Sequence, residues 1–314
     1  MRRPLALVVL LAAGLSPEAS GLAARAEDAT ATLLVDGRER TYHLHRPDTA
    51  GTKPLPLVFV LHGGGGTAAN MDRLTQGGWK ALADREGVLL VYPEGVERRW
   101  NDGRRGTGWR AHEEEIDDIG FLAALLAHLT ERYPVDPKRV FATGISNGGM
   151  MSLRLACELS EKFAAVAAVT AALPADLAER CRPAAPISVL VMNGTDDPLV
   201  PYAGGEVGFG ARRLGKVWST TDTLRFWAKH DQCPESRAVE RLPDRDPKDQ
   251  TRVRRETFSP CRAGTEVVLV AVEGGGHTWP GGRQYLPELL IGKTSRDLDA
   301  TQAIWEFFSR HRKQ

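Results

Sequence analysis

Ser146 lies in the pentapeptide Gly144-Ile145-Ser146-Asn147-Gly148, between a predicted strand at 140–143 and a predicted helix that begins at Asn147. Such a pentapeptide is a weak signal alone, and its place between a strand and a helix makes it informative. A turn this tight leaves no room for a Cβ atom at the flanking positions, and it lifts the serine hydroxyl out at the carboxyl edge of a sheet. We therefore predict a nucleophilic hydroxyl at Ser146.

A nucleophilic serine needs a general base, which follows the serine along the chain in folds with this type of turn. His230, His277 and His311 follow Ser146. His230 falls on an amphipathic helical pattern and His311 in a charged C-terminal segment. His277 lies in a glycine-rich segment directly after an apolar run, where an imidazole can reach the serine without obstruction. We predict His277 as the base.

An acid must orient that imidazole and stabilise it when it is protonated. The adjacent residues Asp196 and Asp197 follow a predicted strand at 187–192, which is the expected place for this acid. Spacing alone does not choose between the two carboxylates.

Backbone amides are the expected donors to the negative charge that develops during attack on a carbonyl group. Asn147, next after the serine, should provide one N–H. The second should come from the glycine run 63–66, where Gly64 is the first choice and Gly65 the second. A phosphate cradle is disfavoured because no Lys-Ser/Thr follows these glycines. His62 is expected to hold this loop in place.

Apolar runs alternate with amphipathic patterns along the chain, starting with the uninterrupted run 55–61. Strands that are apolar throughout are buried on both faces, as in parallel sheets covered by helices. We predict an α/β fold with a mostly parallel, doubly wound sheet and an N-terminal antiparallel hairpin at 32–46. Residues 27–314 are expected to form a single domain. Further strands are predicted at 88–92, 140–143, 163–171, 187–192 and 266–272, and helices at 116–133, 147–162, 217–230 and 297–310.

Residues 1–26 have the pattern of a cleaved signal peptide: two arginines, an apolar run over 5–15 and Ala24-Arg25-Ala26. Cleavage near 19–21 is the alternative. The apolar run is shorter than the roughly 20 residues that a membrane span requires, and no later run could anchor the chain. We expect a secreted or periplasmic protein without a membrane anchor.

The four cysteines form an even set, which in an exported protein predicts two disulfides. None lies in a C-x-x-C pair, which argues against a zinc site. Three pairings are possible, and proximity in the sequence favours Cys157 with Cys181 and Cys233 with Cys261.

The overall composition is that of an ordinary globular protein, with 42% hydrophobic and 26% charged residues. Lys and Arg total 41 against 40 Asp and Glu, and no basic stripe is interleaved with aromatic residues. This balance disfavours a nucleic-acid partner, and no obligate protein partner is evident.

Two polar segments fit the predicted sheet poorly. Residues 97–115 are rich in glycine and arginine and contain Trp100 and Trp109, which are candidates to line a pocket. Residues 234–256 are densely charged and are expected to form a solvated surface loop.

Seven segments together resemble the secreted polyhydroxybutyrate depolymerase/feruloyl esterase family of α/β-hydrolases. They are LHGGGGT, WNDGR, DDIGFL, YPVDPKRVFATGISNGGMMSLRLACE, NGTDDPLVPY, GGGHTWPGG and DATQAIWEFF. The resemblance implies that the catalytic acid is the aspartate before proline, Asp197, and that the serine and histidine are Ser146 and His277. It also suggests Trp279 as a wall of the acyl pocket, and disulfides are common in the family.

This resemblance implies a secreted serine esterase that forms an acyl-enzyme and needs no metal or organic cofactor. Its substrates would be hydroxyalkanoate oligomers or hydroxycinnamoyl and acetyl esters. Polymer-degrading members usually append a linker and a substrate-binding domain, and the sequence reaches Gln314 with neither, so soluble substrates are favoured over solid polyester. The arginine-rich segment 97–115 lies where substrate preference should be set, but its sequence does not identify the acyl group.

Two other functions are compatible with the same scaffold. A serine peptidase is disfavoured because the sequence contains no propeller domain and no evident acidic pair for a substrate amine. A polysaccharide-binding protein without activity is disfavoured because the candidate serine, histidine and acid are all present.

Overall fold

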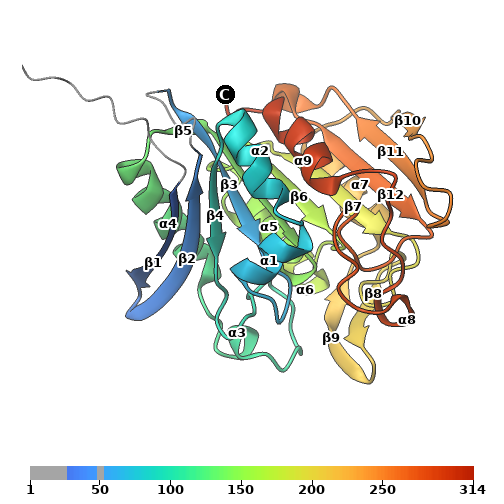
Figure 1. Ribbon diagram of the computed structural model, residues 1–314, viewed down its shortest axis with the longest axis horizontal. Helices are drawn as coiled ribbons and strands as arrows, with labels where there is room; N and C mark the ends of the chain where they lie inside the picture. The colour runs from blue at the N-terminus through green and yellow to red at the C-terminus, as the bar shows by residue number, and fades with distance from the viewer. Residues whose placement is uncertain (1–26, 48–52) are drawn as a thin grey trace, which may run out of the picture.

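Ten strands form one sheet in the computed structural model, which describes residues 27–47 and 53–314 (Figure 1). Their order across the sheet is β1-β2-β4-β3-β5-β6-β7-β12-β11-β10. The strands from β4 to β12 in this order pair in parallel, and the pairs at both edges are antiparallel. The strands are β1 (Glu27–Val35), β2 (Arg38–Arg46), β3 (Leu55–Leu61), β4 (Leu89–Pro93), β5 (Val135–Ile145), β6 (Ala165–Val169), β7 (Ser188–Gly194), β10 (Ala238–Arg241), β11 (Arg252–Phe258) and β12 (Val267–Glu273).

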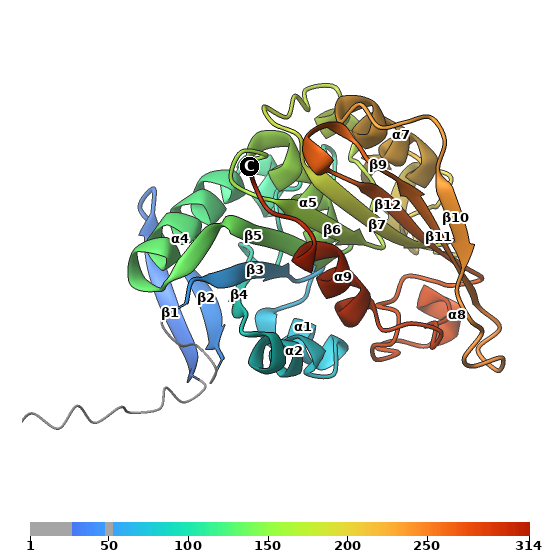
Figure 2. The same cartoon turned by 90° about the horizontal axis from the view of Figure 1, so that it is seen from above.

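Helices cover both faces of this sheet, which confirms the predicted α/β fold (Figure 2). Because side chains alternate along a strand, β3 contributes to two cores. Phe59 belongs to the core that is covered by α4, α5 and α7, and Val58 belongs to the core that is covered by α1, α2 and α9. The helices are α1 (Ala68–Leu74), α2 (Gly78–Glu86), α3 (Arg110–Glu113), α4 (Asp118–Arg132), α5 (Asn147–Glu158), α6 (Ala175–Ala178), α7 (Thr220–His230), α8 (Glu288–Ile291) and α9 (Ala300–Ser309).

The N-terminal hairpin is confirmed, with its turn at Asp36-Gly37. Both turn residues have positive φ angles, 49° and 74°, as a two-residue hairpin turn requires. This hairpin pairs through β2 with β4 and so extends the parallel part of the sheet by two strands.

The expectation of a surface loop at 234–256 is wrong in part. Its chain forms β10 and the start of β11, which extend the sheet at its other edge. β10 is exposed along its whole length, and the charges on β11 are neutralised across the ladder, as in the Arg254–Glu273 ion pair at 3.1 Å. An edge strand with so many charges has the composition of a loop, and such charges protect an open edge against pairing with other chains.

The two disulfides join the cysteines that are close in sequence. Cys157 at the end of α5 pairs with Cys181, and Cys233 after α7 pairs with Cys261 before β12. The first ties the helix that follows Ser146 to the segment after α6.

The expected signal peptide at 1–26 lies outside the described residues. Within 27–47 and 53–314, none of the helices is long and apolar enough to cross a membrane.

Candidate active site

Ser146 occupies a strained turn between β5 and α5. Its φ and ψ angles are 56° and −120°, a region that few residues other than glycine adopt. The two flanking glycines are required by close approach: a Cβ at Gly144 would lie 2.5 Å from the carbonyl carbon of Gly148, and one at Gly148 would lie 2.5 Å from the Leu61 carbonyl oxygen. The pentapeptide is therefore packed against the end of β3, and the serine side chain lies at the carboxyl edge of the sheet.

His277 and Asp197 meet at the same edge. His277 follows β12 and Asp197 follows β7, and these two strands are parallel neighbours. The His277 Nδ1–H donates to Asp197 Oδ2 at 2.7 Å, while Asp197 Oδ1 accepts the amides of Leu199 and Val200 at 2.8 and 2.9 Å. Both side chains of the pair are buried.

The neighbouring acid, Asp196, has different surroundings. It is exposed, and its Oδ1 accepts a hydrogen bond from the Thr195 hydroxyl at 2.8 Å. The structure thus pairs the imidazole with Asp197, the acid that the family motif indicates.

The glycine run after β3 lies beside Ser146, and its amides differ in their bonding. The Gly65 N–H donates to the Arg98 carbonyl at 2.8 Å, so it is already engaged. The Gly64 amide makes no hydrogen bond to any described residue, and a Cβ at Gly64 would lie 3.6 Å from the Asn147 Cβ. Asn147 is the first residue of α5, where backbone N–H groups have no partner within the helix. Neither the Gly64 nor the Asn147 amide makes a hydrogen bond within the described chain, so both are free to donate beside the serine turn.

His62 fixes the start of this glycine run. Its Nε2 accepts the Gly95 amide at 3.0 Å, so its Nδ1 carries the proton and donates to the Gly63 carbonyl at 2.9 Å. Burial lowers the pKa of His62 to about 4, which keeps the ring neutral near pH 7. The geometry agrees with the expected role of holding the loop.

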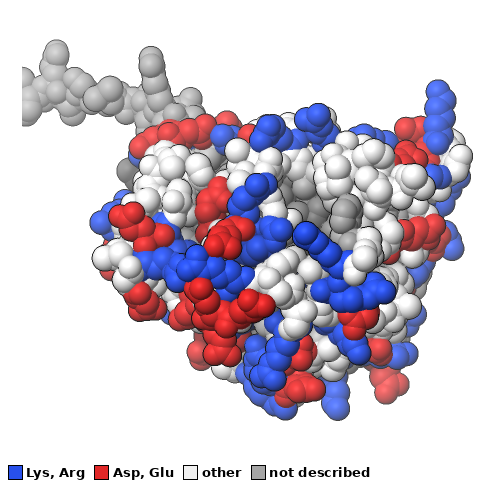
Figure 3. Space-filling model, turned by 90° about the horizontal axis from the view of Figure 1, so that it is seen from below, with Lys and Arg blue, Asp and Glu red and all other residues white. Residues whose placement is uncertain are grey.

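A pocket of about 610 Å³ opens at this edge of the sheet and includes both Ser146 and His277 in its wall. Figure 3 views the molecule from the side of α3 and α8 and shows a hollow in this face with basic side chains around it. Two of the segments that line it were not predicted from the sequence: the hairpin of β8 (Gly205–Phe209) and β9 (Arg212–Val217), and the stretch 283–291. Their sequences lack the regular alternation that would have indicated strands or a pocket wall.

The three predicted tryptophans have different positions. Trp109 lines the pocket, whereas Trp100 and Trp279 are buried and are not part of its wall. Trp100 donates from Nε1 to the His62 carbonyl at 2.9 Å, and Trp279 donates to the Thr301 hydroxyl at 3.2 Å. This placement does not support substrate contact by Trp100 or Trp279, because both rings are enclosed by protein.

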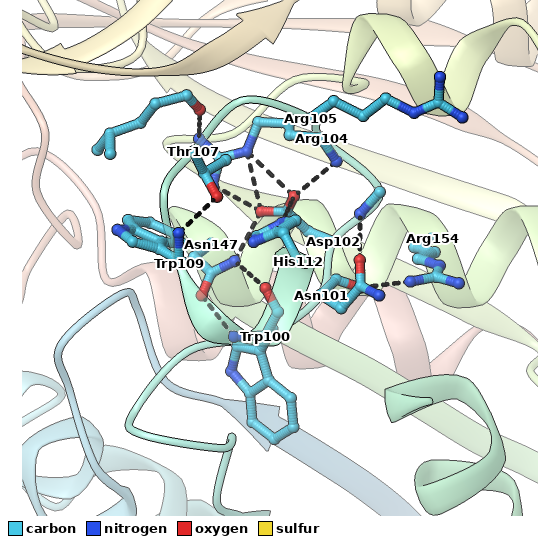
Figure 4. A network of polar contacts seen from close by, with 12 residues as sticks. Trp100, Asn101, Asp102, Arg104, Arg105, Thr107, Trp109, His112, Asn147 and Arg154 are labelled. Carbon is cyan, nitrogen blue, oxygen red and sulfur yellow. Dashed lines mark hydrogen bonds and ion pairs between the residues drawn. The ribbon is translucent and has the colours of Figure 1, made fainter. Parts of the chain in front are cut away.

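Behind Trp109, the side chain of Asn147 belongs to a buried polar network (Figure 4). Its amide nitrogen donates to the Trp100 carbonyl at 2.9 Å and to Asp102 at 2.6 Å, and its oxygen accepts the Trp100 amide at 2.9 Å. Asp102 also accepts from Arg104 Nη2 at 2.7 Å and from His112 at 3.0 Å. The segment 100–112 is therefore bonded directly to the residue that follows Ser146.

Charges in this network balance one another. Burial by itself raises the pKa of Asp102, but Arg104 and His112 outweigh this effect and hold that pKa well below its usual range. Asp102 is therefore an anion, and we name these three residues with Asn147 the Asp102 network.

A second buried ion pair, between Arg40 and Asp118, also holds the segment 100–112. Asp118, at the start of α4, accepts from Arg40 at 2.6 Å and from the Asn101 amide at 2.7 Å. Burial raises the pKa of Asp118, against the lowering effect of Arg40. Asp102 of the WNDGR motif and Asp118 of the DDIGFL motif therefore both fix the segment 100–112 through hydrogen bonds.

The described residues contain no group of three His, Cys, Asp or Glu side chains that could together hold a metal ion.

Known proteins with similar sequences are esterases by name. Residues 40–186 match the family described as Esterase PHB depolymerase. NocK of Nocardia uniformis subsp. tsuyamanensis, a protein named as an esterase, is 38% identical over 291 residues, which cover 89% of this chain and 83% of NocK. Feruloyl esterase B of Piromyces equi is 28% identical over 232 residues, covering 72% of this chain and 40% of that protein.

The structural comparison supports the same fold. An acetyl xylan esterase from Aspergillus awamori matches with a TM-score of 0.54 and 15% identity, over 90% of this chain and 99% of that one. At this identity the likeness shows the α/β-hydrolase fold alone. The sequence matches establish that the chain belongs to the polyhydroxybutyrate depolymerase/feruloyl esterase family and is a carboxylic-ester hydrolase.

Proposed function

We propose that this hydrolase cleaves esters through a covalent acyl-enzyme formed on Ser146. The serine hydroxyl attacks the ester carbonyl while His277 accepts its proton, and Asp197 orients and stabilises the imidazolium. His277 then protonates the departing alcohol and later activates the water that releases the acid.

The backbone amides of Asn147 and Gly64 would bind the oxyanion of each tetrahedral intermediate. Support comes from the Gly64 N–H, which makes no bond within the described chain, and from the position of Asn147 at the start of a twelve-residue helix. Each such donor is typically worth about 3 kcal/mol in the transition state.

The observation that carries the proposal is the 2.7 Å bond between His277 and Asp197 at the wall of the pocket that Ser146 also lines. A buried carboxylate on Nδ1 leaves Nε2 as the nitrogen free to act on a hydroxyl. Ser146 sits in a conformation that costs on the order of 1–3 kcal/mol, which is commonly found at functional sites.

The proposed substrates are hydroxyalkanoate oligomers or hydroxycinnamoyl and acetyl esters. The description of the family and the names of the relatives support this range, and Trp109 provides an aromatic wall for an aryl group. Initial rates on methyl ferulate, short p-nitrophenyl esters, acetylated xylan and hydroxybutyrate oligomers would rank these classes.

Substitution of the proposed residues tests the mechanism. Ser146→Ala should abolish ester hydrolysis and labelling by a fluorophosphonate while the circular dichroism spectrum is unchanged. Asp197→Asn should lower kcat on the order of 10⁴-fold, because the wrong imidazole tautomer is then favoured.

Asp196→Asn is the matched control for the acid, since it changes the adjacent, exposed carboxylate. Its kcat should stay within about twofold of wild type, because an exposed charge that touches no reacting group contributes little. Full activity in Ser146→Ala, or equal losses in the two aspartate variants, would contradict the assignment.

We also propose that residues 1–26 are removed on export and that 27–314 act as a single domain. The two disulfides support an oxidising compartment. N-terminal sequencing of protein recovered from outside the cytoplasm should begin at residue 27, or near 20–22 if the alternative site is used. An intact Met1 there would contradict cleavage.

A further inference from the structure

The wall of the active-site pocket is unusually rich in one charge. Five arginines line it, and neither aspartate nor glutamate does. The arginines come from four separate parts of the chain and are Arg73, Arg99, Arg104, Arg212 and Arg283.

Arg104 differs from the other four because the Asp102 network neutralises it. Its Nε and Nη2 both donate to the Asp102 carboxylate, and its Nη1 donates to the Leu214 carbonyl at 2.7 Å. The remaining four, which we name the rim arginines, form no ion pair with any carboxylate among the described residues.

Arg99 is the rim arginine with the most restricted position. It is half-buried, its guanidinium lies 4.7 Å from the centre of the Trp109 ring, and its Nε is buried without a hydrogen-bond partner in the described chain. A Cβ at Gly65 would lie 2.9 Å from its Nη1, so the guanidinium passes directly over the glycine run.

The surroundings of Arg99 are cationic as well. Burial lowers the pKa of Arg99, and the nearby charges of Arg98 and Arg212 lower it further. Arg99, which lies over the Trp109 ring, and the exposed Arg212 line the same pocket, and neither forms an ion pair with a carboxylate of the described residues. An incoming anion would therefore be stabilised by both positive charges.

The planar guanidinium group matches a carboxylate, because it offers paired N–H donors in a fixed geometry. A neutral ester would leave these charges uncompensated as it displaced their water. We propose that the preferred ester carries a free carboxylate, and that Arg99 and Arg212 bind this carboxylate while Ser146 attacks the ester carbonyl. This inference rests on the proposed function of the pocket.

The carboxylate could belong to either part of the ester, and two matched substrate pairs distinguish these sources. On the acyl side, monomethyl adipate is compared with its neutral amide, methyl adipamate. On the alcohol side, γ-acetoxybutyrate is compared with γ-acetoxybutyramide. Product release is followed by chromatography, so that kcat/KM is obtained for all four compounds.

The wild-type enzyme should prefer the carboxylate member of at least one pair by about tenfold, and the preference should weaken with added salt. Arg99→Gln and Arg212→Gln should each reduce this preference by about fivefold, mainly through KM for the anion. The responding pair identifies the part of the ester that bears the charge.

Arg213→Gln is the matched control, because Arg213 adjoins Arg212, is exposed, has no ion pair in the described chain and does not line the pocket. It removes one positive charge at nearly the same place and should leave the preference unchanged. A wild-type preference for neither carboxylate, or equal effects of Arg212→Gln and Arg213→Gln, would overturn the inference.

These outcomes are distinguishable from a failure of the proposed mechanism. If the neutral esters are hydrolysed and Ser146→Ala abolishes that hydrolysis, the mechanism stands even when the charge preference is absent. If Ser146→Ala hydrolyses all four compounds at the wild-type rate, both proposals fail.

Discussion

Arg104 and the four rim arginines line the same pocket, but within the described chain only Arg104 is paired with a carboxylate. Arg104 is buried, lies 2.7 Å from Asp102 and shares that carboxylate with His112 and Asn147. Arg99 and Arg212 line the pocket and form no ion pair with a carboxylate of the described residues.

This difference distinguishes an arginine that stabilises the fold, Arg104, from arginines that we propose bind a ligand. A buried charge is tolerated only when a partner is close, since transfer of an ion from water is expensive. Arginines that line a pocket without an ion-pair partner contribute little to folding, and their charge is available to a ligand. The Asp102 network should therefore affect stability, and the rim arginines should affect substrate choice.

Removing the charge of Asp102 should have the largest effect. Asp102→Asn leaves Arg104 buried without its anion, so the free energy of unfolding should fall by about 3–5 kcal/mol. Urea denaturation at pH 7 measures this loss. The amide keeps only one of the two oxygens that accept from Arg104, His112 and Asn147, so the position of Asn147 should be disturbed and kcat should fall as well.

Asp36→Asn is the control for that variant, because it removes an acidic charge from an exposed turn. Its free energy of unfolding should stay within about 0.5 kcal/mol of wild type. A similarly small change in Asp102→Asn would show that the Asp102 network does not hold the pocket segment.

His62 is a second buried group that holds the structure, and lowering the pH should reveal its contribution to stability. This contribution should be smaller than that of Asp102. The pKa of His62 is about 4 in the folded protein, below the ordinary value of about 6.5 in the unfolded chain. The unfolded state therefore binds more protons between these values, so this stabilisation is complete above pH 6.5 and is lost as the pH falls toward 4. Between pH 7 and pH 5, the free energy of unfolding should fall by about 2 kcal/mol because of His62 alone.

The variant His62→Gln isolates this share, because a glutamine side chain can still donate and accept but does not titrate. Its stability should depend less on pH than that of wild type over this interval. His43→Gln changes a histidine with an exposed side chain and serves as the control. If His62→Gln and wild type lose stability in parallel between pH 7 and pH 5, the buried imidazole is not responsible.

The rim arginines should give the smallest change in stability. Arg99→Gln and Arg212→Gln should each alter the free energy of unfolding by less than about 0.5 kcal/mol, because neither removes an ion pair. Thermal unfolding of both variants beside Asp102→Asn checks this directly. If the free energy of unfolding of either rim variant fell by more than about 2 kcal/mol, the rim arginines would also stabilise the fold and would not differ from Arg104.

The central sheet could be predicted because strands buried on both faces have uninterrupted apolar sequences. β3 is the clearest example, with all seven residues buried. The edge strands carry no such signal: β10 is fully exposed, and its charged sequence is that of a loop. The β8–β9 hairpin lies outside the ten-stranded sheet and also lacks a periodic pattern.

The site was predictable where position along a strand determines position in space. Ser146, Asp197 and His277 each follow a parallel strand, so they share one edge of the sheet, although their catalytic roles stay predictions. Burial decides what spacing could not: Asp197 is enclosed with His277, and Asp196 is exposed. The enclosure of Trp100, and the presence of Arg99 and Arg212 in the wall of one pocket, depend on tertiary packing that no local pattern encodes.

Asn147 connects the nucleophile to the pocket wall, and this connection limits how the enzyme can be altered. Its main chain adjoins the nucleophile, and its side chain is bonded to Trp100 and Asp102 in the segment that forms one pocket wall. Exchanging that whole segment for one from a relative would disturb the reacting centre along with the selectivity. Single replacements of pocket-lining side chains that do not bond to Asn147, such as Arg99 and Arg212, leave these bonds intact and offer the safer route to a new substrate range.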